Sequence, residues 1–347
     1  MCSSDLLGWL AADGVPSNLA LRDLRAAVDW LRANVAAFGG DPDRIVLMGE
    51  SAGSGCISHL LAANVDLPVA GAILQSGAPA GTLAPDAVAL VTSRFLTAAG
   101  ATSVDELRDA PVEALLAAQE SAVNDSRLDV GAMPFHPWID GDLLQAPSHV
   151  AKLAPVPLVV GTCAHEMELF RDQMPTLTSD VVVALASRKA AALGISDEAR
   201  VRTAVAACGD DLVTATSDLE LNLPNELLAR AHAARGNAVY RYRFTWEAPV
   251  RRACHALDLP FTFGTLDELT WREFAGATGE RAAAADALSA RMQEAWTSFA
   301  ASGRPQDAAV GPWPTGPSAH VPFGADAPTL DFDDEVGQRV GLWLGDA

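Results

Sequence analysis

The chain has 347 residues and half of them are hydrophobic, which is enough for one large hydrophobic core or for two. Its formal net charge of −20 argues against nucleic acid or an anionic membrane as a partner, because both are bound through basic surfaces. No hydrophobic run reaches transmembrane length, so we expect no membrane-spanning segment.

The cysteines indicate neither a disulfide framework nor a zinc site. They are scattered and have no Cys-x-x-Cys spacing. We therefore expect free thiols, a reducing and cytoplasmic location, and no metal or organic cofactor. The sequence does not determine the oligomeric state. The five cysteines are Cys2, Cys56, Cys163, Cys208 and Cys254.

The first regular elements alternate between helix and strand. Hydrophobic residues recur at helical spacing from Leu21 to Phe38, and Asn18 is a candidate cap for this helix. The Gly39-Gly40-Asp41-Pro42 turn ends the helix, and the hydrophobic run Ile45-Val46-Leu47-Met48 reads as a buried strand. A second helix begins soon after this strand, which indicates an α/β fold with a parallel sheet.

The first strand runs into Gly49-Glu50-Ser51-Ala52-Gly53. A Gly-x-Ser-x-Gly pentapeptide is common by itself, but a strand before it and a helix after it are the context of a nucleophile elbow. We therefore predict that Ser51 is a nucleophile in a strained turn and that Gly49 and Gly53 let strand and helix approach closely. The backbone N–H of Ala52 would then point at a developing oxyanion.

Further strands and helices follow along the chain. The run at 238–244 alternates aromatic and charged residues, which is typical of an outer strand. The region from about 85 to 132 and the region from 179 to 234 read as helical insertions. A helix is expected at 282–301, and the tail beyond it has little predicted structure. The expected strands are 69–74, 156–161 and 238–244.

A serine nucleophile needs a base and an acid, which follow it in the order Ser, acid, His in folds of this type. The acid belongs just after a strand end, and Glu166 fits this position best, with Glu168 close behind. Asp140 also precedes the later histidines, but it belongs to an Asp-Gly turn and is interpreted as structural.

Three histidines come late enough to serve as the base. His232 lies in an alanine-rich helical stretch and His320 in the Pro-rich tail. His255 opens a loop after the strand at 238–244, so spacing favours His255 while leaving the other two as alternatives.

Several ordered stretches together resemble the type-B carboxylesterase family, which includes the bacterial para-nitrobenzyl-type esterases and the cholinesterases. They cover nearly the whole chain. They are Phe38–Pro42, Gly49–Gly53, Ala72–Gly77, Ile139–Asp142, Gly161–Thr162 with Glu166 and Phe170, Ala253–Gly264, and Ala295–Ala300 with Gly303 and Pro305.

The resemblance implies an α/β-hydrolase fold, with residues 1–347 as one catalytic domain and no cofactor. It implies that Ser51 is the nucleophile, Glu166 the acid and His255 the base. It places Ser76 near these three as a hydrogen-bonding residue, although a plain turn at a strand end would explain this serine equally well. Glu50 is expected to be a buried structural carboxylate whose side chain points away from the nucleophile.

The chain departs from the family in two places. His165-Glu166-Met167 stands where the family usually has Asp-Glu-Gly, so the glycine is lost while the acid is kept. The family's glycine-rich oxyanion loop lies upstream of the serine, and Gly8-Trp9-Leu10 resembles a segment after that loop. We therefore expect a chain truncated at its N-terminus, where Met1–Leu6 resembles a translated sequencing adapter. Ala52 N–H would then be the only donor left of the family's set. Loss of one oxyanion donor costs roughly 10²–10³ in turnover.

The expected function is hydrolysis of a small-molecule carboxylic ester through an acyl-enzyme. Three alternatives stay open: a non-catalytic, cholinesterase-like interaction protein, an inactive fragment, or another acyl hydrolase such as an amidase, lactonase or peptidase. The acyl and alcohol groups of the substrate cannot be derived from the sequence.

Overall fold

The chain folds into two compact units. The first contains Met1–Pro42, His59–Pro68 and Gly81–Ala154, and the second contains Asp43–Ser58, Val69–Ala80 and Pro155–Ala347. The structure is a computed structural model, and it describes residues 7–77, 79, 81–127, 129–131, 133–174, 176–317, 319–324 and 334–346. The Met1–Leu6 segment, Cys2 and the end of the first predicted insertion at Ala132 lie outside the described residues.

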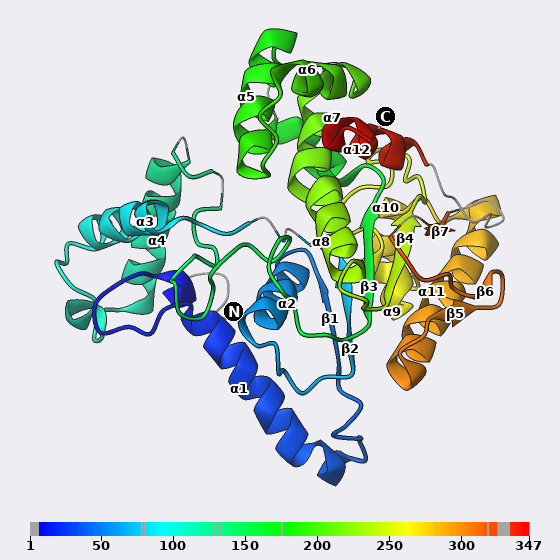
Figure 1. The fold of residues 1–347 in the computed structure, drawn as a ribbon, viewed down its shortest axis with the longest axis horizontal. Coiled ribbons are helices and arrows are strands. Elements are labelled where there is room, and N and C mark those ends of the chain that lie inside the picture. Colours follow the sequence, from blue (N-terminus) through cyan, green and yellow to red (C-terminus); the bar gives the residue numbers. More distant parts are fainter. Residues whose placement is uncertain are drawn as a thin grey trace. The chain divides into compact units, whose positions relative to one another are not determined.

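The first unit is helical. The helix α1 (Leu19–Asn34) continues into the 3₁₀ turn η3 (Val35–Phe38), and Figure 1 shows both at the blue end of the chain. The helices α3 and α4 pack against each other, with Phe95, Ala118 and Ala122 in the small hydrophobic core of this unit. Its other elements are η2 (Leu7–Trp9), α3 (Pro85–Ala98), η4 (Asp105–Leu107) and α4 (Val112–Ser126).

Asn18 occupies the N-cap position of α1, as expected, but its side chain does not hydrogen-bond to the helix. Its backbone is left-handed, with φ +48°, and its amide group is used elsewhere. The amide nitrogen donates to the carbonyl of Trp138 at 2.9 Å and to Asp140 Oδ2 at 2.8 Å, and Trp138 N–H donates back to the amide oxygen at 3.0 Å. Asn18 therefore fastens the helix start to a loop more than a hundred residues later, a partner that local sequence does not reveal.

The second unit is built on a five-stranded parallel sheet in the order β1-β2-β3-β4-β7. Because all the strands are parallel, their carboxyl ends meet at one edge, where ligand sites form in open α/β sheets. The strands are β1 (Val46–Glu50), β2 (Gly71–Gln75), β3 (Leu158–Cys163), β4 (Val239–Phe244) and β7 (His320–Phe323).

The alternating pattern of β4 predicted an outer strand, and this prediction is wrong. The strand β7, from the tail, pairs beside β4. All six residues of β4 are buried. Its charged residues face buried carboxylates instead of water: Arg241 pairs with Glu226 at 2.7 Å, and Arg243 pairs with Asp334 at 2.9 Å. This interior strand has the sequence pattern of an exposed one because its arginines pair with carboxylates instead of facing water.

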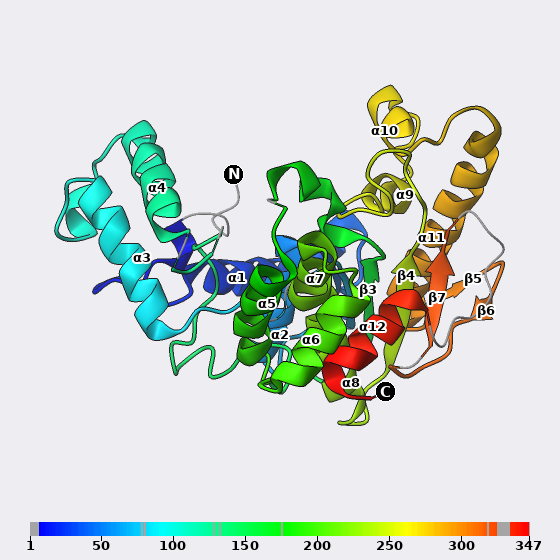
Figure 2. The same cartoon turned by 90° about the horizontal axis from the view of Figure 1, so that it is seen from above.

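Helices cover both faces of the sheet. Tyr242 on one face of β4 packs against Trp296 of α11, with ring centroids 5.2 Å apart, whereas Arg241 on the other face reaches Glu226 of α8. The tail carries the helix α12, which packs on α6 and α8 (Figure 2). The elements of this unit outside the sheet are α5 (Ser179–Ala192), α6 (Glu198–Ala207), α7 (Leu212–Ser217), η6 (Asp218–Asn222), α8 (Leu223–Ala233), α9 (Leu259–Phe263), α10 (Leu269–Phe274), η7 (Gly279–Arg281), α11 (Ala282–Ser302), β5 (Gln306–Asp307), β6 (Gly311–Pro312) and α12 (Glu335–Leu344).

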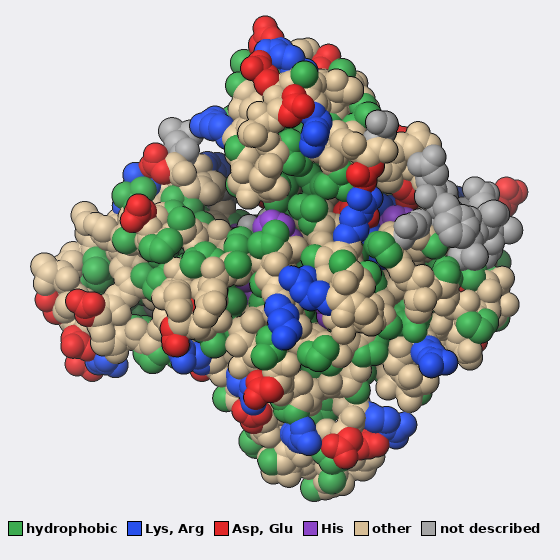
Figure 3. All heavy atoms as spheres, viewed as in Figure 1, with side chains coloured by type: hydrophobic (Ala, Val, Ile, Leu, Met, Phe, Trp, Pro, Cys, Tyr) green, Lys and Arg blue, Asp and Glu red, His purple; other side chains and the backbone are tan. Residues whose placement is uncertain are grey.

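The surface carries both signs of charge. Figure 3 shows acidic and basic side chains scattered among hydrophobic ones, although the whole chain has a formal net charge of −20. Within the described ranges, no helix combines the length and the hydrophobicity that a bilayer crossing requires.

Candidate active site

Ser51 occupies the sharp turn between β1 and α2 (Ala52–Ala63). Its φ is +54°, a left-handed conformation that costs a non-glycine residue on the order of 1–2 kcal/mol. The close approach of strand and helix depends on Gly49, where a Cβ would lie 2.6 Å from the carbonyl carbon of Gly53. A Cβ on Gly53 itself would meet nothing within 4 Å, so the expected steric need for glycine holds at Gly49 only.

The structure brings Ser51, His255 and Glu166 together at the carboxyl edge of the sheet. His255 Nε2 lies 2.7 Å from Ser51 Oγ, and His255 Nδ1 lies 2.7 Å from Glu166 Oε2. Because a carboxylate only accepts hydrogen bonds, Nδ1 carries a proton, and in the neutral imidazole Nε2 is left to accept from the serine hydroxyl. The serine, the imidazole and the carboxylate therefore form a continuous hydrogen-bonded chain.

Both carboxylate oxygens and the backbone carbonyl of Glu166 are hydrogen-bonded. Glu166 is fully buried, its Oε1 accepts from Cys163 N–H at 2.7 Å, and its backbone carbonyl accepts from His255 N–H at 3.0 Å. Burial lowers the pKa of His255, but the hydrogen bond to Glu166 and the charges of Glu166 and Glu50 outweigh it and raise that pKa above its ordinary value. The charged imidazolium is therefore stabilised in this position.

The alternative residues are engaged elsewhere. His232 Nε2 lies 2.8 Å from the carbonyl of Val156, and His320 is buried in the strand β7. The carboxylate of Glu168 forms a two-point ion pair with Arg171.

Asp140, the remaining alternative, belongs to the first unit. Its Oδ1 accepts from the backbone N–H groups of Asp142 and Leu144 at 3.1 and 2.8 Å, and its Oδ2 accepts from Asn18. These bonds organise the Asp-Gly turn, in line with the structural interpretation of this residue.

Glu50 does not point away from the nucleophile, and that expectation is wrong. Its Oε1 lies 3.3 Å from His255 Nε2, the same nitrogen that faces Ser51 Oγ. The side chain of Glu50 is 13% exposed, and burial raises its pKa to about 7, against the opposing charge of His255. Glu50 is the last residue of β1 and precedes Ser51, whose left-handed backbone turns the chain.

A second buried carboxylate, which the sequence did not single out, lies three residues after the histidine. Asp258 is fully buried, and its Oδ2 accepts from Gln75 Nε2 at 2.8 Å and from the Tyr242 hydroxyl at 3.2 Å. Burial and the charge of Glu166 raise the pKa of Asp258 to about 6. The Ala-Leu-Asp-Leu-Pro run after His255 was the available signal, but nothing in it specified the partners from β2 and β4.

Ser76 directly follows β2, beside the site, but it has no described hydrogen bond to the three residues. Its hydroxyl lies 3.9 Å from Cys163 Sγ, its N–H donates to the carbonyl of Gly161 at 2.8 Å, and its φ is +47°. Ser76 therefore lies in a strained turn at a strand end, next to Cys163, whose N–H donates to Glu166.

Two further features complete the surroundings. The Phe170 ring lies 6.2 Å from the His255 ring, between centroids, and so covers part of the imidazole. Ala52 begins α2, and the first N–H groups of a helix have no partner within the helix, so this donor is available next to Ser51 Oγ. Among the described side chains, no group of three acidic, histidine or cysteine residues is arranged to hold a metal ion.

The four described cysteines are Cys56, Cys163, Cys208 and Cys254, and all are buried free thiols. Burial raises the pKa of the Cys163 and Cys254 thiols, which lie near the acidic side chains of the site. Neither thiol is therefore activated as a nucleophile.

Comparison with known proteins gives a consistent result. A sequence model described as the carboxylesterase family matches residues 5–325. The chain is 32% identical to the para-nitrobenzyl esterase of Bacillus subtilis (strain 168), over 86% of this chain and 61% of that protein. It is 30% identical to the fumonisin B1 esterase of Sphingopyxis macrogoltabida, over 97% of this chain and 63% of that protein.

The structure agrees with these sequence matches. It superposes on a solved PNB esterase with a TM-score of 0.80 and 28% identity, covering 98% of this chain and 72% of that one. The fold is therefore that of an α/β-hydrolase. The chain spans 61% and 63% of the lengths of the two curated relatives. By sequence and by structure, this chain belongs to the carboxylesterase family.

Proposed function

We propose that the chain hydrolyses small-molecule carboxylic esters through an acyl-enzyme on Ser51. The observation that carries this proposal is the unbroken sequence of short contacts from Ser51 Oγ through His255 to Glu166, both at 2.7 Å. Such a chain is the arrangement that makes a serine hydroxyl nucleophilic at neutral pH. The curated relatives named as esterases support the same reaction class.

In the first half-reaction, Ser51 Oγ attacks the ester carbonyl and its proton passes to His255 Nε2. The imidazolium that results is stabilised by Glu166 at Nδ1 and by Glu50 beside Nε2. The carbonyl oxygen becomes an oxyanion, for which the Ala52 N–H is the nearest donor that this chain offers at the elbow. The imidazolium then gives its proton to the alcohol oxygen, the C–O bond breaks, and the acyl group remains on Ser51.

In the second half-reaction, water replaces the alcohol. His255 Nε2 takes a proton from water, which attacks the acyl carbonyl and forms a second oxyanion. Return of the proton to Ser51 Oγ releases the carboxylic acid and restores the starting state. In this scheme Ser51, His255 and the reacting oxygens exchange every proton among themselves, and we propose that no metal or organic cofactor takes part.

The test uses p-nitrophenyl acetate with the wild-type chain, Ser51→Ala and a matched control, Ser54→Ala. Ser54 lies in the first turn of α2 and is buried, but it is not part of the hydrogen-bonded chain. We expect p-nitrophenol release from wild type and Ser54→Ala, and loss of at least about 10³-fold in Ser51→Ala. Equal rates in wild type and Ser51→Ala would overturn the proposal.

The same experiment separates the alternatives. No serine-dependent turnover at all would favour an interaction protein or a fragment that lacks activity. Turnover of anilides, lactones or peptides that exceeds turnover of matched esters would replace the ester assignment with another acyl hydrolase. We further propose a cytoplasmic location, which the buried free thiols favour.

A further inference from the structure

The catalytic acid proposed above depends on a short segment whose own structure is weak. Glu166 begins the 3₁₀ helix η5 (Glu166–Gln173), and 3₁₀ turns have poorer hydrogen-bond geometry than α-helices and seldom persist for long. The position after the acid is Met167, whereas the resembling family usually has glycine there. The Cys163 and His255 N–H groups bind Glu166 directly. Further contacts from outside η5 are needed to hold the rest of the segment and, with it, the place of the carboxylate.

The first outside contact is a buried serine on the helix α7. Ser217 is 2% exposed, and its hydroxyl accepts from Met167 N–H at 2.9 Å. The same hydroxyl donates to the carbonyl of Val213 at 2.9 Å, one turn earlier in α7. Both the donor and the acceptor capacity of this hydroxyl are used, so its direction is fixed, and it holds the backbone of the residue directly after the acid.

The second outside contact joins the other end of η5 to the start of the same helix. Arg171 Nη2 donates to Asp211 Oδ2 at 3.0 Å, and the same guanidinium also binds Glu168 within η5. Asp211 caps α7, because its Oδ2 accepts from the N–H and the hydroxyl of Thr214 at 3.1 and 2.9 Å. The helix α7 therefore holds η5 at two points: through Ser217, its last residue, and through Asp211, its N-cap.

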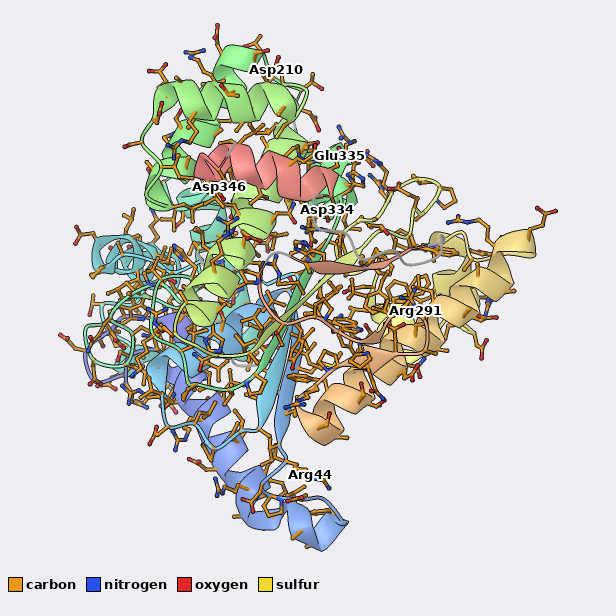
Figure 4. All side chains as sticks on the ribbon, turned by 45° about the vertical axis from the view of Figure 1, so that its right-hand side comes forward. Arg44, Asp210, Arg291, Asp334, Glu335 and Asp346 are labelled. Carbon is orange, nitrogen blue, oxygen red and sulfur yellow. The ribbon has the colours of Figure 1, made fainter. Side chains whose placement is uncertain are left out.

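The helix α7 is itself anchored to the C-terminal helix α12. Asp218 follows Ser217 directly, is fully buried, and accepts from Arg339 Nε and Nη2 at 3.0 and 3.1 Å. Figure 4 labels Asp334 and Glu335 at the beginning of α12 and Asp346 beyond its other end. Asp334 binds Arg243 of the interior strand β4, so α12 is fixed to the sheet as well. The support for the acid segment thus extends back to the sheet that carries the nucleophile.

We infer that Ser217 is a positioning residue for the reaction proposed above: by holding the backbone at Met167, it sets the place of the Glu166 carboxylate against His255. The Arg171–Asp211 pair is the second, weaker point of the same support, since its arginine side chain is 44% exposed. The expected effect of Ser217 on turnover rests on the proposed function. Its expected effect on the pKa of His255 does not. Ser217 touches neither substrate nor reacting atoms and acts only through Glu166.

The test compares Ser217→Ala, Ser217→Thr and Arg171→Gln with the wild-type chain. The matched control is Thr203→Ala on α6, whose hydroxyl also donates to the carbonyl four residues earlier, at 2.9 Å, and has no described bond to η5. Two quantities are measured: kcat and KM for p-nitrophenyl acetate, and the pKa of His255 from an NMR titration of the imidazole. The pKa of His255 reports its contact with Glu166 even if the protein hydrolyses no ester.

We expect Ser217→Ala to lower kcat by about tenfold with KM nearly unchanged, since a small displacement of a catalytic group slows the chemical step. The pKa of His255 should fall by about half a pH unit or more, because the Glu166 charge that raises it moves away. Ser217→Thr should restore most of both values, Arg171→Gln should shift both less, and Thr203→Ala should shift neither.

Two results separate this inference from the proposed function. If Ser217→Ala melts at a lower temperature but keeps the His255 pKa of wild type, the serine is merely structural and the inference is overturned. If the wild-type chain has no Ser51-dependent turnover, the proposed function fails, and the His255 pKa alone decides whether Ser217 positions Glu166.

Discussion

Glu50→Gln tests whether the carboxylate beside the histidine assists catalysis. The substitution keeps the size of the side chain and removes its charge, 3.3 Å from His255 Nε2. A negative charge there stabilises the imidazolium that forms when Ser51 loses its proton. Glutamine cannot supply that charge, so the barrier to attack on the ester should rise.

The size of the effect follows from the geometry. With an effective dielectric constant of about 20, two unit charges 3.3 Å apart attract by about 5 kcal/mol. Because the pKa of Glu50 is about 7, the carboxylate is ionised in only part of the molecules near neutral pH. Solvent contact also screens the attraction between the two charges. About 1–2 kcal/mol of it is then left, which corresponds to a roughly five- to thirtyfold loss in kcat/KM in Glu50→Gln.

The assay is kcat/KM for p-nitrophenyl acetate from pH 5 to pH 10. Glu50 raises the pKa of His255, so its loss should lower that pKa and move the acidic limb of the profile to lower pH. The matched control is Glu247→Gln, since Glu247 Oε1 lies at the same 3.3 Å from Nε2 of another histidine, His165. A Glu50→Gln profile that coincides with wild type in both rate and acidic limb would refute the reasoning.

Three further predictions concern stability, measured by urea unfolding. Gly49→Ala should lower the free energy of unfolding by about 3 kcal/mol, because its Cβ would lie 2.6 Å from the Gly53 backbone. Gly53→Ala should change the free energy of unfolding by less than about 1 kcal/mol. Equal effects of the two substitutions would contradict the packing argument. Asp218→Asn should cost about 3–5 kcal/mol by removing the buried anion of the Arg339 guanidinium. Glu335→Gln alters the 79% exposed partner of the same guanidinium and should cost less than about 1 kcal/mol. Asp258 has a pKa raised to about 6 by burial, so its folded state binds a proton more tightly than the unfolded state, and stability is lost as pH rises from about 4 to about 6. Asp258→Asn should remove this loss, on the order of 2–3 kcal/mol, and an unchanged pH slope between pH 4 and pH 7 would count against it.

The order of strands and loops was enough to predict which three side chains meet at one edge of the sheet. Ser51, Glu166 and His255 each follow a hydrophobic strand, and parallel strands place their carboxyl ends together. Position along the chain could therefore select Glu166 over the neighbouring Glu168, although only the structure shows that the latter is taken by Arg171.

What the sequence left open depends on contacts between distant residues. The direction of the Glu50 side chain is set by the turn after β1, and the amide of Asn18 is used by a loop near Trp138. The arginines of β4 suggested an exposed strand because their buried partners, Glu226 and Asp334, come from other parts of the chain. Such pairings have no local signature, because each half looks like an ordinary surface charge.

The left-handed backbone at Ser51 has a consequence for how this site can change over time. Glycine accepts φ +54° without strain, so Ser51→Gly should make the folded chain more stable by on the order of 1 kcal/mol while removing the nucleophile. Selection for stability alone would therefore favour losing the serine. A lineage that keeps serine here retains a residue that folding disfavours, and a descendant freed from the proposed catalysis could gain stability by a single substitution at this position.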